Sequence, residues 1–409
     1  MENPKIRFKG FTKDWEQRKL ADVCSRVQGN DGRMKLPTLT ISAGNGWMRQ
    51  EDRFSGNIAG KEQKNYTLLH TGELSYNHGN SKSAKYGAVF SLRNYEEALV
   101  PRVYHSFRVE EGSADYIEYY FATKLPDREL RKLISSGARM DGLLNIGYDE
   151  FMGIKMMFPS IKEQNEIAAY FRSLDHLITL HQRKCDQTKN LKKYMLRKMF
   201  PQNGAKVPEI RFDGHTYDWE QRKFGEITEL KSASRVHKDE WTSNGVPFYR
   251  SSDVMTAING TENEKAFISE ELYEKLSKVS GKLEEGDILV TGGGSVGNPY
   301  IVPDNKPLYT KDADLLWIKN KGKFHPYFLY EFFFSPTFRN YLGSISHVGT
   351  IAHYTITQLS DTPISLPSFE EQKEVGEYFQ SLDHLITLHQ RKCDELKKMK
   401  KYMLQNMFI

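Results

Sequence analysis

The feature that most constrains the fold of this chain is an internal duplication. Residues 173–186 and 381–394 both read SLDHLITLHQRKCD, at an offset of 208 residues, and looser matches extend this block in both directions. A second duplicated block opens each half, where the pattern PxIRF followed by WEQRK begins at Pro4 and again at Pro208. Because a repeat on this scale marks repeated structural units, we expect the two halves to share one fold.

The segments between the duplicated blocks barely agree in sequence. They mix strand-like runs, at residues 86–92 and 286–292, with helix-like runs at residues 116–125 and 326–334. This mixture predicts an α+β domain in each half. The halves are therefore expected to share a framework while their surfaces differ.

Residues 161–200 contain neither proline nor glycine, and apolar or small side chains recur there at spacings of three and four. The apolar spacing recurs in the second copy, so the two segments are predicted to form two long helices packed as a coiled coil. Ser160 with Glu163, and Ser368 with Glu371, predict a capping box at each helix start. The seam positions are Phe171, Leu174, Ile178, His181, Cys185, Phe379, Leu382, Ile386, His389 and Cys393.

The link from the first helix to the second half is short, at about residues 201–207. If the second helix packs on the first, it has to run back, so we expect an antiparallel pair and a pseudo-two-fold repeat with the variable domains at opposite ends. The expected α+β architecture has a first variable domain at 1–159, a first helix at 160–203, a second variable domain at 204–367 and a second helix at 368–409.

Composition narrows the class of protein. The formal charge of +5, from 58 basic and 53 acidic residues, permits nucleic-acid binding without demanding it. Three isolated cysteines fit a reducing compartment and give no disulfide framework or zinc motif, so we expect no metal site. No apolar run approaches the roughly 18 residues of a membrane span and no signal peptide is recognisable, so a cytoplasmic protein is expected.

Basic, amide and hydroxyl side chains gather in polar, glycine-rich loops of both variable regions. Such side chains read base edges or bind phosphates, so they are the candidate DNA-binding residues. In the first half they are Arg49, Arg53, Lys61, Lys64, Asn77, His78, Asn80, Lys82, Lys85 and Arg139. In the second half they are Arg235, His237, Lys238, Arg250, Ser251, Ser252, Asp253 and His347. The basic tails of both helices are open to two interpretations, a solvated face or a surface for phosphate or a partner.

Two motifs have plainer interpretations than a catalytic one. GGGSVG at residues 292–297 fits a dinucleotide-binding pattern, but NPYIV follows where a helix should begin, so we predict a tight β-turn. His176 and His181 are five residues apart, which does not place both on one helical face for a metal. No catalytic residues are predicted.

The order of variable domain, helix, variable domain and helix resembles the specificity subunits of type I restriction–modification enzymes. The resemblance covers essentially the whole chain. It is carried by WEQRK at the start of each half, by Pro159 with Glu163 and Gln164, and by Pro367 with Glu371 and Gln372. It implies two target-recognition domains separated by helical spacers.

The resemblance also implies a function. Such a subunit has no catalytic activity and reads an asymmetric, bipartite site in double-stranded DNA. It assembles with two modification (methyltransferase) subunits and with restriction (motor-nuclease) subunits, and S-adenosylmethionine, ATP and Mg²⁺ belong to these partners rather than to this chain. The alternatives are a self-contained DNA-modifying enzyme with duplicated domains and a coiled-coil assembly protein that does not touch DNA.

Overall fold

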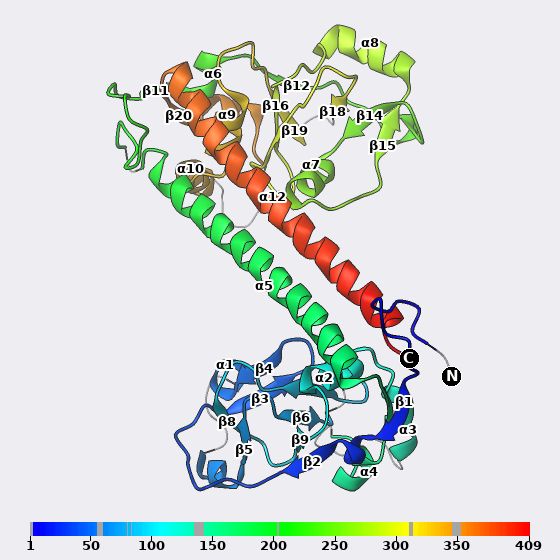
Figure 1. Ribbon diagram of the computed structural model, residues 1–409. Coiled ribbons are helices and arrows are strands. Elements are labelled where there is room, and N and C mark those ends of the chain that lie inside the picture. The colour runs from blue at the N-terminus through cyan, green and yellow to red at the C-terminus, as the bar shows by residue number, and fades with distance from the viewer. Residues whose placement is uncertain are drawn as a thin grey trace. The chain divides into compact units, whose positions relative to one another are not determined.

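The computed structural model describes residues 3–54, 60–79, 81–82, 84–134, 143–202, 204–310, 314–345 and 353–409. The chain divides into two compact units (Figure 1). The first unit joins residues 1–181 to residues 391–409, and the second comprises residues 182–390. Each unit therefore holds one variable domain and a part of each long helix.

The first unit is built on a four-stranded antiparallel sheet in the order β2-β9-β6-β7. Its strands are β1 (Glu16–Lys19), β2 (Cys24–Val27), β3 (Leu39–Ser42), β4 (Gly46–Arg49), β5 (Thr67–His70), β6 (Leu74–Asn77), β7 (Ala88–Ser91), β8 (Glu97–Val100), β9 (His105–Val109) and β10 (Lys155–Phe158). Its shorter helices are η1 (Leu20–Asp22), α1 (Gln50–Phe54), η2 (Gly60–Asn65), α2 (Ala114–Ala122), α3 (Asp127–Leu133) and α4 (Tyr148–Met152).

The second unit repeats this sheet in the order β12-β19-β16-β17. Its strands are β11 (Glu220–Lys223), β12 (Leu230–Ser232), β13 (Trp241–Thr242), β14 (Val246–Tyr249), β15 (Ala266–Ile268), β16 (Ile288–Thr291), β17 (Pro299–Ile301), β18 (Tyr309–Thr310), β19 (Leu315–Ile318) and β20 (Pro363–Leu366). Its shorter helices are α6 (Phe224–Ile227), η3 (Lys238–Glu240), α7 (Ser251–Asn259), α8 (Glu270–Ser280), α9 (Pro326–Phe332), α10 (Pro336–Ile345) and α11 (Ile356–Asp361).

The duplicated WEQRK block forms the same strand pair in both units. Glu16 lies opposite Phe158 in β1 and β10, and Glu220 lies opposite Leu366 in β11 and β20. Each pair therefore fastens the start of a variable domain to the strand that leads into a long helix. The predicted shared α+β framework is confirmed.

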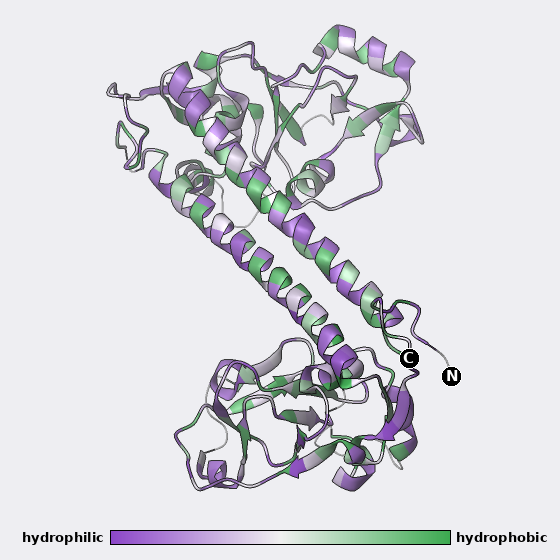
Figure 2. Cartoon of the chain, viewed as in Figure 1, coloured by the Kyte–Doolittle hydropathy of each residue, from purple (hydrophilic) through white to green (hydrophobic). Residues whose placement is uncertain are grey.

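The two long helices are α5 (Ile161–Lys198) and α12 (Phe369–Asn406), each of 38 residues. In the first unit Asp175 of α5 pairs with Lys400 of α12, and Ile178 lies against Cys393. In the second unit Cys185 lies against Ile386 and Lys192 pairs with Asp383. As numbers rise along α5, those of its neighbours on α12 fall, so the segments are antiparallel within each unit, as predicted. Along both helices hydrophilic and hydrophobic residues alternate (Figure 2).

The capping box predicted at each helix start is replaced by an ion pair. Ser160 Oγ accepts from the backbone nitrogen of Glu163 at 3.3 Å, as expected for a cap. Both carboxylate oxygens of Glu163, however, accept from Arg7, at 2.7 and 2.9 Å. Arg211 and Glu371 repeat this arrangement at 2.7 Å for both bonds. The glutamate that the sequence predicted to cap the helix therefore binds the arginine of the duplicated PxIRF block instead.

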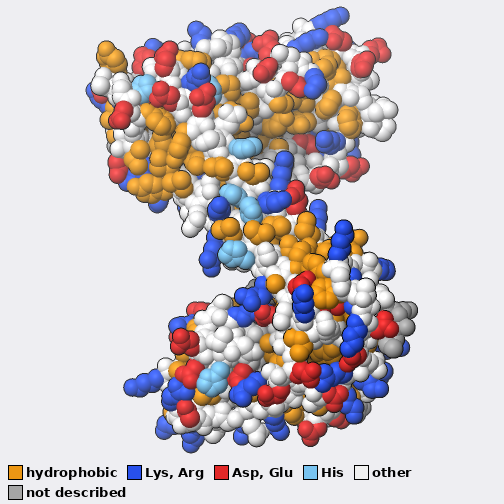
Figure 3. All heavy atoms as spheres, in the orientation of Figure 1, with side chains coloured by type: hydrophobic (Ala, Val, Ile, Leu, Met, Phe, Trp, Pro, Cys, Tyr) orange, Lys and Arg blue, Asp and Glu red, His pale blue; other side chains and the backbone are white. Residues whose placement is uncertain are grey.

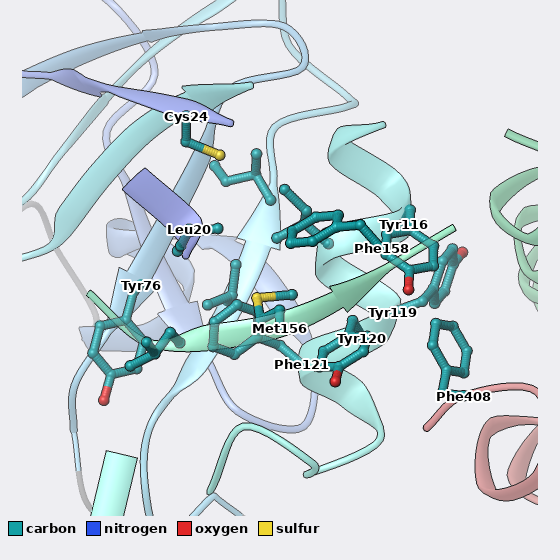
Figure 4. Packing of buried hydrophobic residues seen from close by; sticks show 14 of the residues in the cluster. Leu20, Cys24, Tyr76, Tyr116, Tyr119, Tyr120, Phe121, Met156, Phe158 and Phe408 are labelled. Atoms are coloured by element: carbon teal, nitrogen blue, oxygen red, sulfur yellow. The ribbon is translucent and has the colours of Figure 1, made fainter. Parts of the chain in front are cut away.

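The aromatic core of each unit includes a phenylalanine from the end of a long helix. Phe408 packs edge-on against Trp15 in the first unit, among the side chains of α2 and β10 (Figure 4). Phe200 packs edge-on against Trp219 in the second unit. The motif YMLxxMF, which occurs at residues 194–200 and again at 402–408, therefore contributes a core phenylalanine to each unit.

Candidate nucleic-acid interface

One hairpin loop occupies the same place in the two units. It lies between β6 and β7 at residues 78–87 in the first unit, and between β16 and β17 at residues 292–298 in the second. In both units its first residue accepts a backbone hydrogen bond from the segment that precedes the final strand: Leu144 N donates to His78 O, and Tyr354 N donates to Gly292 O, both at 2.8 Å. The two loops are structurally equivalent although their sequences are unrelated.

The glycine-rich loop of the second unit is a braced β-turn rather than a nucleotide-binding loop. Strand β17 follows it where a dinucleotide fold would begin a helix, which confirms the predicted turn. Arg339 of α10 donates to Asn298 Oδ1 at 3.0 Å and to Val296 O at 3.3 Å, and burial lowers its pKa below the ordinary value. Gly297 has φ +75°, and an added Cβ would lie 2.8 Å from Leu342, so only glycine fits there. The loop is therefore held in one shape.

In the first unit, the structure brings Arg53 and Asn77 together. Both donate to the backbone oxygen of Ile41, at 2.7 and 3.2 Å. Both also line two cavities of about 270 and 620 Å³. The side chains of Arg53 and Asn77 thus already have hydrogen-bond partners within the protein. They line the surface next to the hairpin loop.

The other first-unit candidates lie in different settings. Lys82 and Lys85 are exposed on the hairpin loop, and Lys61 and Lys64 are exposed on η2. Arg49 is exposed at the end of β4 and pairs with Glu51 at 2.7 Å. His78 is buried, with its ring 4.9 Å from that of His105. Asn80 and Arg139 lie outside the described residues, as does His347 of the second half.

In the second unit, Arg250 and Asp253 hold the start of α7. Arg250 Nε donates to Asp253 Oδ2 at 2.8 Å, and Arg250 Nη2 donates to the backbone oxygen of Glu264 at 2.6 Å. Hydrogen bonding to Arg250 and Asn263 outweighs burial and lowers the pKa of Asp253. The geometry gives these two side chains a structural task that the sequence did not reveal.

Ser251 lies beside the hairpin loop of the second unit. Its Oγ donates to the backbone oxygen of Asp314 at 3.0 Å, and the backbone nitrogen of Gly292 donates to the same oxygen at 2.8 Å. Ser252 is exposed next to it. Arg235, His237 and Lys238 are exposed on a separate stretch that leads through η3. The second-half candidates therefore form two groups rather than one.

The predicted seam residues lie on the inner side of the long helices to different degrees. Phe171, Leu174 and Cys185 are buried, and their copies Phe379, Leu382 and Cys393 are buried too. The remaining seam residues are half-buried: Ile178, His181, Ile386 and His389.

An exposed apolar set on the long helices was not singled out from the sequence. Leu177 is 36% exposed and its copy Leu385 is 41% exposed. The full set, which we call the helix apolar set, consists of Leu177, Leu180, Leu191 and Tyr194 on α5, with their copies Leu385, Leu388, Met399 and Tyr402 on α12. Packing inside the chain does not explain why both copies keep exposed apolar residues. The signal available from sequence was the recurrence of apolar residues at the same positions of both copies, outside the seam.

The comparisons with known proteins agree with one another in the family that they indicate. Residues 217–398 match the family described as Type I restriction modification DNA specificity domain. The Type I restriction enzyme MjaVIII specificity subunit of Methanocaldococcus jannaschii is 24% identical over 304 residues, which cover 71% of this chain and 68% of that one. The chain is therefore similar to the specificity subunits of type I restriction enzymes, and its residues 217–398 match their DNA specificity domain.

Two further comparisons extend over nearly the whole length of the chain. The putative type I restriction enzyme MjaX specificity subunit of the same organism is 22% identical over 416 residues, which cover 96% of this chain and 92% of that one. The crystal structure of the S subunit from M. genitalium superposes with a TM-score of 0.60 at 14% identity, covering 100% of this chain and 99% of that one. The latter likeness concerns the fold. Among the described residues of the chain, no helix is long and apolar enough to cross a membrane.

Proposed function

We propose that this chain is the non-catalytic subunit that selects the DNA sequence in a type I restriction–modification complex, with each variable domain reading one half of an asymmetric, bipartite site. The observation that carries the proposal is the pairing of one framework with two sets of loops that differ in sequence. The sheet order and the position of the hairpin loop are the same in both units, while the loop sequences differ. Two unlike readers on one framework suit two unlike half-sites.

The helix apolar set supports the binding of two copies of one partner protein. Each unit presents four of its members: the first has Leu177 and Leu180 of α5 with Met399 and Tyr402 of α12, and the second has the corresponding copies. Equivalent surfaces bind equivalent partners, and exposed leucine and tyrosine side chains are typical of protein interfaces. We assign these surfaces to two modification subunits. Restriction subunits would join the same complex.

The cofactors in this proposal belong to the partners. S-adenosylmethionine would bind the modification subunits, and ATP with Mg²⁺ the restriction subunits. The purified chain should therefore transfer no methyl group when incubated with DNA and S-adenosylmethionine. Methyl transfer by the chain alone would favour the alternative of a self-contained modifying enzyme.

The decisive experiment is a domain exchange. The chain is co-expressed with its modification subunit in a host that lacks adenine methylation, and the methylated motif is mapped across the genome. Residues 20–157 are then replaced by those of a relative. One half of the motif should change and the other should persist, whereas simultaneous change of both halves would contradict modular reading.

A further inference from the structure

In the first unit, an arginine fills a corner between the end of β7, helix α2 and helix α5. Arg93 Nε donates to Asp115 Oδ1 at 2.8 Å, and Arg93 Nη1 donates to Glu118 Oε1 at 3.0 Å. Its guanidinium carbon also lies 5.6 Å from the ring centroid of Tyr119. The corner thus combines carboxylates with an aromatic face around one guanidinium group.

Backbone hydrogen bonds identify the equivalent corner in the second unit. Leu92 N donates to Glu73 O at 2.8 Å, and Val302 N donates to Asp287 O at 2.9 Å. The next residues are Arg93 and Pro303, so Pro303 stands where the arginine does.

The helix beside the corner aligns in the same way. The backbone nitrogen of Ser113 donates to Gln164 Oε1, and that of His325 donates to Gln372 Oε1. By this alignment Tyr327 takes the place of Asp115, and Tyr330 takes the place of Glu118. The second unit has kept the corner but has neither the cation nor the two carboxylates on the helix.

The corner of the second unit is open. Two cavities, of about 520 and 840 Å³, meet there, and Tyr327 and Ile301 line both of them. Pro303 lines the larger cavity, while Tyr300 and Tyr330 line the smaller one. In the view of Figure 3, hydrophobic side chains gather on the face of the second unit over which α12 runs.

The charges around the two cavities favour a cation. Glu284, Glu285 and Glu377 line the larger cavity and Asp383 lines the smaller. Lysines lie nearby: Lys319 is 3.4 Å from Glu284 and Lys373 is 3.9 Å from Glu377.

The lysine that lines the smaller cavity is held by acids. Lys192 Nζ lies 2.8 Å from Glu331 and 2.7 Å from Asp383, so the Asp383 carboxylate compensates its charge within the wall. Glu285 and the aromatic faces remain for a ligand, and a guanidinium group binds both carboxylates and tyrosine rings. Phosphate groups would be repelled.

We propose that this corner of the second unit binds an arginine side chain from a basic segment of a partner polypeptide, in the position that the first unit fills with its own Arg93. The size of the site favours a polypeptide, because the joined cavities exceed the volume of one guanidinium group. They also extend along α12 from Glu377 to Thr387, which is about 15 Å of helix and matches an extended peptide segment. The inference does not depend on how the chain reads DNA.

The test uses the full chain and two tripeptides, acetyl-Leu-Arg-Leu-amide and acetyl-Leu-citrulline-Leu-amide, with binding followed by ligand-observed NMR. Citrulline has the shape of arginine without its charge. The arginine peptide should bind about tenfold more tightly than the citrulline peptide. It should also bind about tenfold more tightly than arginine amide, because the flanking leucines contact the aromatic walls. Equal affinity in either comparison would overturn the proposal.

A substitution from the first unit provides the location test. Pro303→Arg places a guanidinium group of the chain itself in the corner and should abolish binding of the arginine peptide. The control Pro303→Ala also removes the proline ring from the backbone and should leave binding intact. Unchanged binding to Pro303→Arg would place the peptide elsewhere and overturn the proposal. A DNA duplex should not displace the peptide, and displacement would contradict a protein ligand.

Discussion

Arg7 and Glu163 are joined by two hydrogen bonds across 156 residues of sequence, with the glutamate side chain only 1% exposed. Hydrogen bonding to this carboxylate, stronger than the opposing effect of burial, raises the pKa of Arg7 above its ordinary value. Arg211 and Glu371 form the same pair in the second unit. Each pair ties the segment that opens a half to the first turn of a long helix.

Removal of the carboxylate charge of Glu163 should destabilise the first unit. Breaking a buried ion pair leaves the partner charge uncompensated, so Glu163→Gln should lower the free energy of unfolding by about 3 kcal/mol. The matched control is Glu16→Gln, because Glu16 pairs with Lys13 on the surface and should contribute less than about 0.5 kcal/mol. Urea unfolding followed by tryptophan fluorescence measures both. Equal effects of the two substitutions would contradict a structural role for the buried pair.

The buried Glu331 should make the stability of the second unit depend on pH. Burial raises the pKa of this carboxyl to about 8, from an ordinary value of 4.5. Between these values the unfolded chain releases the proton and the folded chain keeps it, so stability falls as pH rises, by at most about 1.4 kcal/mol per pH unit. Glu331→Gln does not titrate and should gain stability relative to the wild type across this window.

This comparison requires urea unfolding at several pH values from about 5 to about 8. The exposed Glu262→Gln provides the control, and its difference from the wild type should stay constant with pH. A constant difference for Glu331→Gln as well would show that the carboxyl titrates normally in the folded chain.

Lysines of the first hairpin loop should contribute phosphate contacts. Each phosphate contact releases about one counterion, so Lys82→Ala with Lys85→Ala should weaken DNA binding and reduce the slope of log K against log salt by about 1 to 2. Lys132→Ala on α3, remote in sequence from these loops, is the control. Fluorescence anisotropy of the partner-bound complex over a salt series measures the slope. An unchanged slope would remove this loop from the DNA surface.

The helix apolar set should determine how many modification subunits bind. Leu177→Asp in the first unit and Leu385→Asp in the second should each reduce the complex from two modification subunits to one, because a charge replaces a buried apolar contact worth about 2 kcal/mol. The double variant should bind neither. Analytical ultracentrifugation gives the stoichiometry, and Gln187→Asp, at another exposed position on α5, should bind both. Loss of both copies in either single variant would contradict independent surfaces.

The sequence predicted the parts of the fold that depend on local or repeated signals. The apolar spacing and the lack of proline and glycine predicted a helix over 161–200, and α5 spans Ile161–Lys198. The turn at residues 292–297 was also predictable, because glycine freedom and the following NPYIV are local. The partner of Glu163 was not, because it lies 156 residues away.

In the candidate site too, the sequence predicted local features but not the contacts between distant residues. The sequence indicated which loops carry basic and amide side chains, but Arg53, Arg250 and Asp253 hydrogen-bond within the protein. Which partner a polar side chain takes depends on packing between distant segments, and residue type alone does not encode it. The assignment of individual residues to DNA contact remains a prediction.

Because Phe408 is part of its core, the first unit can complete its folding only after residues 391–409 have been synthesised. The core around Trp15 includes this residue, and Ile6 and Tyr120 hydrogen-bond to the backbone of Asn406 and Ile409. On the ribosome, the domain translated first must wait for residues 391–409 before its core can close, whereas residues 182–390 can complete the second unit earlier. The half that is made first is therefore finished last, and a nascent chain exposes its aromatic side chains to chaperones throughout that interval.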